Sequence, residues 1–172
     1  MKLKFYPTTI FRETPKVTFF DAGIGLTNGC DVVIHSEEAI SPPDKFRDEQ
    51  YYVHNHQIDH NLVITGERKF ILINPIWDEP HNVIYLNRYM GALEIPIGTY
   101  HRSISGKEGS IVLNQTIRDK FFDPKKEFIP QKLNKSELIK ARKRTPIYWI
   151  NEDNQIKRVL VDPLERKVKA VA

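Results

Sequence analysis

The chain has 172 residues, of which 40% are hydrophobic and 28% charged, and its net charge is +4. A chain of this length can bury a core without cross-links, and its single cysteine, Cys30, excludes an internal disulfide. No run approaches the roughly 18 consecutive apolar residues that a membrane span needs, and the first residues lack the apolar stretch of a secretory signal. We therefore expect a cytoplasmic protein with no membrane partner.

The charge is distributed unevenly along the chain. Residues 1–117 carry a net charge of −3, whereas residues 118–172 carry +7. The basic residues of the second segment are scattered among acidic ones, and no aromatic stacking motif accompanies them. We read this excess as a solvated surface and expect no nucleic-acid partner.

Short strand-like segments rich in Val, Ile, Tyr and Phe recur through the first 117 residues. In chain order they are Lys16–Phe20, Asp31–His35, Tyr51–His56, Asn61–Thr65, Lys69–Asn74, Asn82–Leu86, Ala92–Pro96, Tyr100–Ile104 and Ser110–Thr116. Turn-forming clusters separate them, among them Thr65–Glu67 and Ser105–Gly109. Short strands without long helices between them predict an all-β antiparallel sandwich or barrel.

The pattern changes towards the C-terminus. Ser136 is a candidate N-cap for a short helix over Glu137–Lys143, with basic residues in its last turn. Two further strand candidates, Ile147–Ile150 and Lys157–Val161, flank a turn and predict a hairpin. We expect a barrel with its N-terminal strands over residues 1–120 and a small α/β appendage over residues 121–172, which packs on the barrel because it is too small to hold a core alone.

Four of the six histidines are candidates for one site. They are His54, His56, His60 and His101. Side chains at i and i+2 of a strand share a face, so the first two could chelate one cation, and His60 keeps the same parity if the strand continues. His101 follows the turn formers Pro96 and Gly98. A closed sheet would bring these separated positions to a common interior.

These residues resemble the two signature motifs of the cupin superfamily over roughly residues 48–114. The pattern comprises His54-Asn55-His56, Gly66, Gly91, Pro96-Ile97-Gly98 and His101. The resemblance implies a double-stranded β-helix, or jelly roll, with a metal held by two histidines and a glutamate of the first motif and one histidine of the second. The chain departs from the family pattern at Asp48, where a glycine is usual, at His60, which takes the glutamate position, and at Ser105, which replaces an asparagine.

Four neutral imidazoles would suit a divalent transition metal such as Fe, Ni, Zn or Cu better than Mg or Ca. Asp59 or Glu94 could orient an imidazole from outside the ligand set. The leading hypothesis is therefore a metal-binding cupin enzyme acting on a small molecule, with dioxygenase, isomerase and decarboxylase chemistry all open. Histidines that merely fill the barrel without a metal are the structural alternative.

A second hypothesis dispenses with the metal. The chain also resembles the cupin ketoisomerases of deoxysugar biosynthesis, in its histidine pair and in the segment Ile117–Phe122. That resemblance implies a sugar-nucleotide ketoisomerase or epimerase with His54 and His56 as acid and base. Tyr52 shares their parity and either assists catalysis and binds substrate or packs inward. Asn114 either contacts substrate or lies in the core or at the surface.

A third hypothesis is a non-catalytic small-molecule-binding cupin, because cupin barrels serve unrelated functions. The resemblance further suggests a homodimer paired through the N-terminal strands, which would cover exposed sheet edges.

Overall fold

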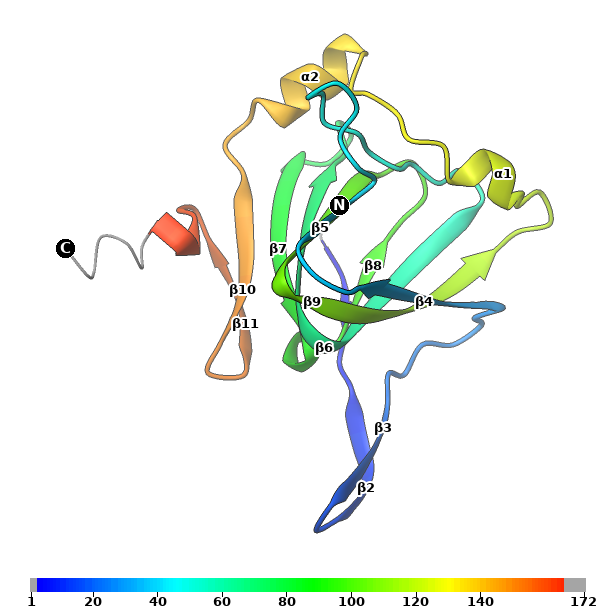
Figure 1. Ribbon diagram of the computed structural model, residues 1–172, viewed down its shortest axis with the longest axis vertical. Helices are drawn as coiled ribbons and strands as arrows, with labels where there is room; N and C mark the ends of the chain where they lie inside the picture. The colour runs from blue at the N-terminus through cyan, green and yellow to red at the C-terminus, as the bar shows by residue number, and fades with distance from the viewer. Residues whose placement is uncertain (1–2, 166–172) are drawn as a thin grey trace.

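Two long strands, β6 (Gln57–Ile73) and β9 (Tyr100–Arg118), form the frame of the fold in this computed structural model, which describes residues 3–165. They pair antiparallel along almost their whole length, from Gln57↔Arg118 to Ile73↔Tyr100. The pairing is interrupted by register shifts between Val63 and Thr65 and between Gly66 and Arg68. The sheet bends there and curls back on itself, so that its two halves face each other (Figure 1).

Glycines make this bend possible. Gly66 and Gly109 have φ values of 74° and 67°, in the left-handed region. A Cβ atom on Gly66 would lie 2.6 Å from the carbonyl oxygen of Gly109, and one on Gly109 would lie 2.1 Å from that of His35. The turns predicted at Thr65–Glu67 and Ser105–Gly109 are therefore bends within continuous strands, and each long strand unites two predicted ones.

The remaining barrel strands extend both halves of the sheet. They are β1 (Phe5–Tyr6), β4 (Gly29–His35), β5 (Ala39–Ser41), β7 (His81–Asn87) and β8 (Ala92–Ile95), with a 3-10 turn at Arg88–Met90. β8 pairs with the first half of β6 and with β1, whereas β7 pairs with the second half of β6. Both β4 and β5 pair with β9.

The main core lies between the two halves of the barrel. Its buried side chains are Val63, Phe70, Leu72, Trp77, Ile84, Leu86, Met90, Leu93, Ile95 and Val112. This arrangement confirms the predicted all-β jelly-roll architecture. No helix among the described residues is long and apolar enough to cross a membrane.

Most of the C-terminal segment packs against the outside of β6 and β7, whereas its first helix lies beside the segment before β6. It comprises α1 (Pro124–Glu127), α2 (Ser136–Arg142), β10 (Ile147–Glu152) and β11 (Gln155–Val159). β10 adds to the sheet by parallel pairing with β7, and the buried Leu138 and Ala141 of α2 cluster with Ile71 and Ile73. The helix begins one residue earlier than predicted, with Lys135 rather than Ser136 at the N-cap.

The division into residues 1–120 and 121–172 stays a prediction, and residues 1–2 and 166–172 lie outside the described part of the chain.

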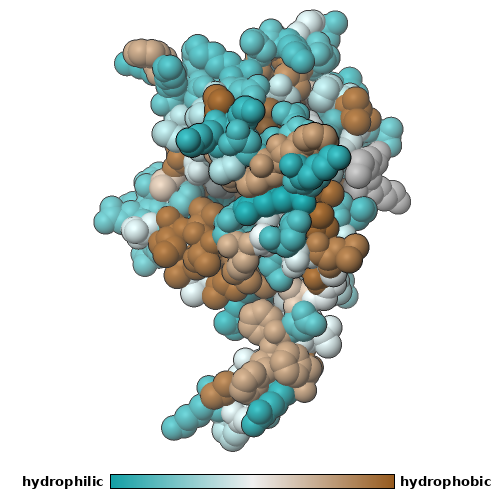
Figure 2. Space-filling model, turned by 90° about the vertical axis from the view of Figure 1, so that its right-hand side faces the viewer, coloured by the Kyte–Doolittle hydropathy of each residue, from teal (hydrophilic) through white to brown (hydrophobic). Residues whose placement is uncertain are grey.

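A hairpin of β2 (Thr9–Thr14) and β3 (Val17–Asp21) projects away from the barrel as an arm (Figures 1 and 2). The first of these strands was not predicted. Every residue of the two strands is exposed, including Phe11, which is 68% exposed.

Candidate active site

The segment before β6, predicted as a strand, is an irregular turn. Tyr51 and Tyr52 form single bridges to Gln131 and His101, and regular strand structure begins only at Gln57. The buried carboxylate of Glu127 in α1 shapes this turn. Its Oε2 accepts hydrogen bonds from the backbone N–H groups of Asn55 (2.8 Å) and His56 (3.4 Å). The alternation of side chains along a strand therefore does not determine where His54 and His56 point.

Three buried side chains converge inside the barrel from this turn, β6 and β9. The Oδ2 atom of Asp59 lies 3.5 Å from Nε2 of His54 and 3.7 Å from Nε2 of His101. The two imidazole rings are 4.9 Å apart between centroids. One ligand atom from each residue lies within 4.8 Å of the others, so the three side chains can act on a common atom.

The carboxylate of Asp59 is held in place through its other oxygen. Oδ1 accepts hydrogen bonds from Nε2 of Gln57 (2.6 Å) and Nδ2 of Asn114 (3.0 Å). Gln57 is in turn fixed by the Arg118 guanidinium, whose Nε donates to its Oε1 at 2.7 Å. Asn114, predicted as a substrate contact, lines the cavity, but its amide nitrogen positions Asp59. This anchoring leaves Oδ2 directed at the two imidazoles.

The hydrogen bonds of His101 fix which nitrogen carries its proton. Nδ1 lies 3.0 Å from the carbonyl oxygen of Thr99, which can only accept, so Nδ1–H donates and the neutral ring presents the lone pair of Nε2 to Asp59. Burial, reinforced by the nearby His54, lowers the pKa of His101 well below its ordinary value, and Asp59 opposes this shift. At neutral pH His101 is thus a proton acceptor facing a carboxylate.

His54 lies between two carboxylates. Its Nε2 faces Asp59, and its Nδ1 lies 3.5 Å from Oε2 of Glu127 without a hydrogen-bond partner among the described residues. Each nitrogen of the His54 ring therefore has a carboxylate oxygen 3.5 Å away.

The other two predicted ligands lie elsewhere, so the structure corrects the prediction that four rings meet at one point. His56 is on the surface, where its Nδ1 lies 2.9 Å from Oδ2 of Asp119. His60 is buried on the opposite face of β6, with Nδ1 3.0 Å from the carbonyl oxygen of Gln115 and Nε2 3.6 Å from the Glu94 carboxylate. Because β6 begins at Gln57, residues 59 and 61 face the cavity and residue 60 faces away.

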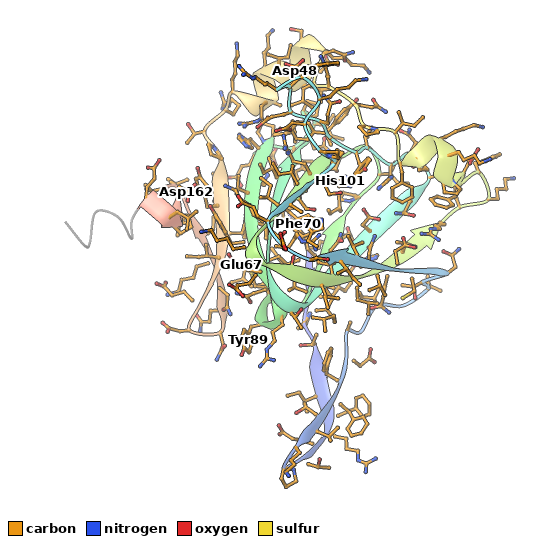
Figure 3. The ribbon with its side chains drawn as sticks, viewed as in Figure 1. Asp48, Glu67, Phe70, Tyr89, His101 and Asp162 are labelled. Atoms are coloured by element: carbon orange, nitrogen blue, oxygen red, sulfur yellow. The ribbon has the colours of Figure 1, made fainter. Side chains whose placement is uncertain are left out.

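The converging side chains line a cavity of about 230 Å³. Its walls are formed by Val33, Ser41, Tyr52, His54, Asp59, Asn61, Arg68, Phe70, His101, Ser103, Asn114 and Phe128. The Tyr52 ring is stacked near that of His54, with centroids 6.4 Å apart, so the structure places this predicted residue at the cavity. Phe128 is 40% exposed and brings the cavity to the surface beside α1. Figure 3 shows His101 inside the barrel, on the side towards α1.

Solved structures with this fold include enzymes that act on nucleotide-linked sugars. One is dTDP-4-dehydrorhamnose 3,5-epimerase from Elizabethkingia anophelis, with a TM-score of 0.53 and 14% identity over 77% of this chain and 76% of that chain. Another is a variant of the 3,4-ketoisomerase QdtA from Thermoanaerobacterium thermosaccharolyticum in complex with TDP-4-keto-6-deoxyglucose, with a TM-score of 0.55 and 14% identity over 83% and 95%.

A third is the 3'-monoepimerase ChmJ from Streptomyces bikiniensis in complex with dTDP-quinovose, with a TM-score of 0.54 and 11% identity over 92% and 79% of the two chains. No protein-family model and no curated protein matches the sequence. At these identities the likeness concerns the fold, which is the jelly roll expected from the sequence motifs.

Proposed function

From the cupin fold that this chain shares with sugar-nucleotide epimerases and ketoisomerases, we propose that it is an enzyme that moves a proton at a carbon next to a carbonyl group in a nucleotide-linked sugar. The observation that carries this proposal is the convergence of His54, Asp59 and His101 in one cavity. The fold neighbours named as sugar epimerases and ketoisomerases support the substrate class. In this proposal His101 replaces His56 as the partner of His54.

The proposed chemistry follows from the protonation states. Nε2 of His101 accepts the proton from the carbon next to the carbonyl, and the electron pair of the broken C–H bond forms an enolate. Asp59 stabilises the resulting imidazolium, because its Oδ2 faces that nitrogen. Return of the proton to the opposite face of the same carbon completes an epimerisation. Return of the proton to the former carbonyl carbon completes an isomerisation, provided that the hydroxyl proton of the neighbouring carbon passes to the former carbonyl oxygen. Neither reaction needs an oxidant or reductant.

The cavity is large enough for a sugar ring but too small for a whole nucleotide sugar. About 230 Å³ is less than the roughly 300–1,000 Å³ of typical ligand pockets. A sugar ring would occupy the cavity beside Tyr52 and Phe128, and the nucleotide would remain at the surface.

Thermal unfolding with and without a nucleotide sugar tests the substrate class. We expect TDP-4-keto-6-deoxyglucose to raise the melting temperature of the protein, and a chelator to leave that rise unchanged. A melting temperature that no nucleotide sugar changes would count against this substrate class.

A divalent transition metal on the same three side chains is a second candidate. Two ligands at about 2.1 Å from a tetrahedral ion are roughly 3.4 Å apart, close to the 3.5 and 3.7 Å between Asp59 and the two imidazoles. The outer nitrogens of His54 and His101 face Glu127 and the Thr99 carbonyl, as the outer nitrogens of metal-bound imidazoles usually do. Two histidines and a carboxylate suit iron or zinc, and a bound ion would polarise the substrate carbonyl.

Metal analysis separates the two candidates. Protein purified without a histidine tag would contain close to one ion per chain if the second candidate holds, and the Asp59→Asn variant would lose it. Proton exchange that continues in metal-free protein would favour the first candidate.

We also propose that two copies of the chain pair through the projecting hairpin. The exposed apolar residues of the hairpin include Ile10, Phe11 and Phe20, and the outer face of β4 exposes Val32 and Ile34. Figure 2 shows apolar surface on the barrel as well as on the arm. Packing of one copy's arm on the other copy's barrel would cover both surfaces.

A further inference from the structure

A buried arginine lines the cavity away from the histidines. Arg68 lies on β6 just after the bend and is only 1% exposed, yet it forms part of the cavity wall together with Phe70 and Ser103. Phe70 pairs with Ser103 in the sheet and lies two residues closer to the bend than the partner of His101, which places this wall deeper in the barrel.

The guanidinium of Arg68 is held by neutral groups. Its Nε donates to Oγ of Ser110 at 2.7 Å, Nη2 to the Ser110 carbonyl at 3.0 Å, and Nη1 contacts Nε2 of His35 at 3.2 Å. No carboxylate within residues 3–165 forms an ion pair with it, and burial alone lowers its pKa, to about 10. Arg68 therefore keeps its positive charge at neutral pH.

The histidine beside Arg68, His35, is neutral and supplies no counter-charge. Oγ of Ser105 donates to the Glu37 carbonyl at 2.9 Å, so the same oxygen accepts from Nδ1–H of His35, also at 2.9 Å. Nε2 of His35 then carries a lone pair, which accepts a hydrogen bond from Nη1 of Arg68. The acidic group of the cavity, Asp59, is engaged with Gln57, Asn114 and the two imidazoles.

Two N–H groups of Arg68 are only weakly engaged. Nη1 reaches Oγ of Ser103, and Nη2 reaches the carbonyl of Val33, both at 3.5 Å, the outer limit of a hydrogen bond. These weak contacts use one hydrogen on each terminal nitrogen, and both Ser103 and Val33 line the cavity. A ligand with two adjacent oxygens could replace both contacts at once.

We propose that Arg68 binds a carboxylate of the ligand, so that the substrate is an acidic sugar of the uronate type. This inference deepens the proposed function and rests on it in placing the sugar ring in this cavity. Burying a cation without a counter-charge costs free energy, and a single bound carboxylate would offset that cost. A phosphate dianion would leave a net negative charge close to Asp59, so its binding is less favourable.

The test compares ligands that differ only in charge. The affinity of wild-type protein for D-glucuronate and D-glucuronamide is measured by NMR titration, with inorganic phosphate as a third probe. We expect glucuronate to bind at least tenfold more tightly than the amide, and the ¹⁵Nε resonance of Arg68 to shift with it. Equal affinities, no binding of either sugar, or a preference for phosphate over glucuronate would overturn the proposal.

Variants of Arg68 test whether this residue causes the preference for glucuronate over glucuronamide. Arg68→Gln removes the charge and should reduce the preference for glucuronate to within about twofold, whereas Arg68→Lys should keep part of it. Arg12→Gln removes a positive charge on the projecting arm and should leave the preference unchanged. A preference that persists in folded Arg68→Gln protein would contradict the assignment, and the wild-type comparison decides the question if that variant does not fold.

The proposed reaction and the proposed carboxylate site would be contradicted by different results. If glucuronate binds through Arg68 but the protein exchanges no proton on any keto sugar, the carboxylate site stands and the proposed reaction does not. If a neutral keto sugar exchanges its proton but glucuronate shows no preference over the amide, the reaction stands and the carboxylate site does not.

Discussion

Asp59 is the residue on which the proposed site depends. One of its oxygens is anchored by Gln57 and Asn114, and the other faces the Nε2 atoms of His54 and His101. Such an arrangement favours an imidazolium that forms during proton transfer, because the counter-charge is already in place.

Replacement of Asp59 by asparagine should abolish most of the activity while preserving the fold. The amide oxygen can still accept from Gln57 and Asn114, but the negative charge beside the imidazoles is lost. We expect proton exchange to fall by about 10²–10⁴-fold, with an unchanged circular dichroism spectrum. His56→Asn is the matched control, because His56 lies on the surface with Asp119, and it should retain activity. An active Asp59→Asn enzyme would contradict the role of the carboxylate.

His35 should make the stability of the protein depend on pH. Burial and, secondarily, Arg68 lower the pKa of His35 from 6.5 to about 4. The unfolded chain therefore binds a proton more readily than the folded one, so stability is full above about pH 6.5 and is lost as the pH falls towards 4. The contribution is up to about 3 kcal/mol of unfolding free energy.

Urea unfolding of wild-type protein and of His35→Gln at pH 7 and pH 4.5 measures this contribution. The stability difference between the two proteins should shrink at the lower pH, because only the wild type loses the contribution of a neutral histidine. A difference in unfolding free energy that is the same at both pH values would contradict the proposed effect of His35.

At the scale of the elements, the bend in β6 and β9 decides which side chains meet. Gly109 has φ +67°, and a Cβ atom there would lie 2.1 Å from the His35 carbonyl oxygen. We expect Gly109→Ala to lower the unfolding free energy by about 2 kcal/mol or more. Gly106→Ala is the control, since nothing lies within 4 Å of its Cβ position, and should cost less than about 1 kcal/mol. Equal losses in both variants would show that the bend does not require glycine.

The sequence predicted most of the fold. The short apolar runs and the Pro96, Gly98 and His101 spacing led to the jelly roll, which the structure has. The merging of neighbouring runs into β6 and β9 was not predicted, because a glycine between two apolar runs is equally typical of a turn and of a bend.

The site was predicted only in part. His54, His101 and Tyr52 line the cavity, where their roles stay predictions, whereas His56 and His60 do not line it. The error came from extending strand parity through residues 53–56, which a contact with Glu127, more than 70 residues later in the chain, holds in a turn. Counting parity from Gln57 would have placed Asp59 in the cavity, but nothing local in the sequence marks where the strand begins.

At the scale of the whole molecule, the projecting hairpin bears on assembly. Deletion of residues 9–21, with a short glycine linker in their place, should convert a dimer into a monomer if the arm packs on a second copy. Light scattering coupled to size-exclusion chromatography measures the mass directly. Arg12→Gln should leave the mass unchanged, because it keeps the apolar side chains of the arm. A monomeric wild-type protein would contradict the proposed pairing.

Hydrogen exchange into a nucleotide-linked keto sugar, with or without the carboxylate that Arg68 would bind, tests the central claim most directly. Protein in deuterium oxide is incubated with TDP-4-keto-6-deoxyglucose, and proton NMR follows the carbons next to the carbonyl group. We predict deuterium incorporation that depends on protein concentration and is lost in His101→Asn. No incorporation above the rate without protein, or incorporation that His101→Asn leaves unchanged, would contradict the account of this site as a proton-transfer centre.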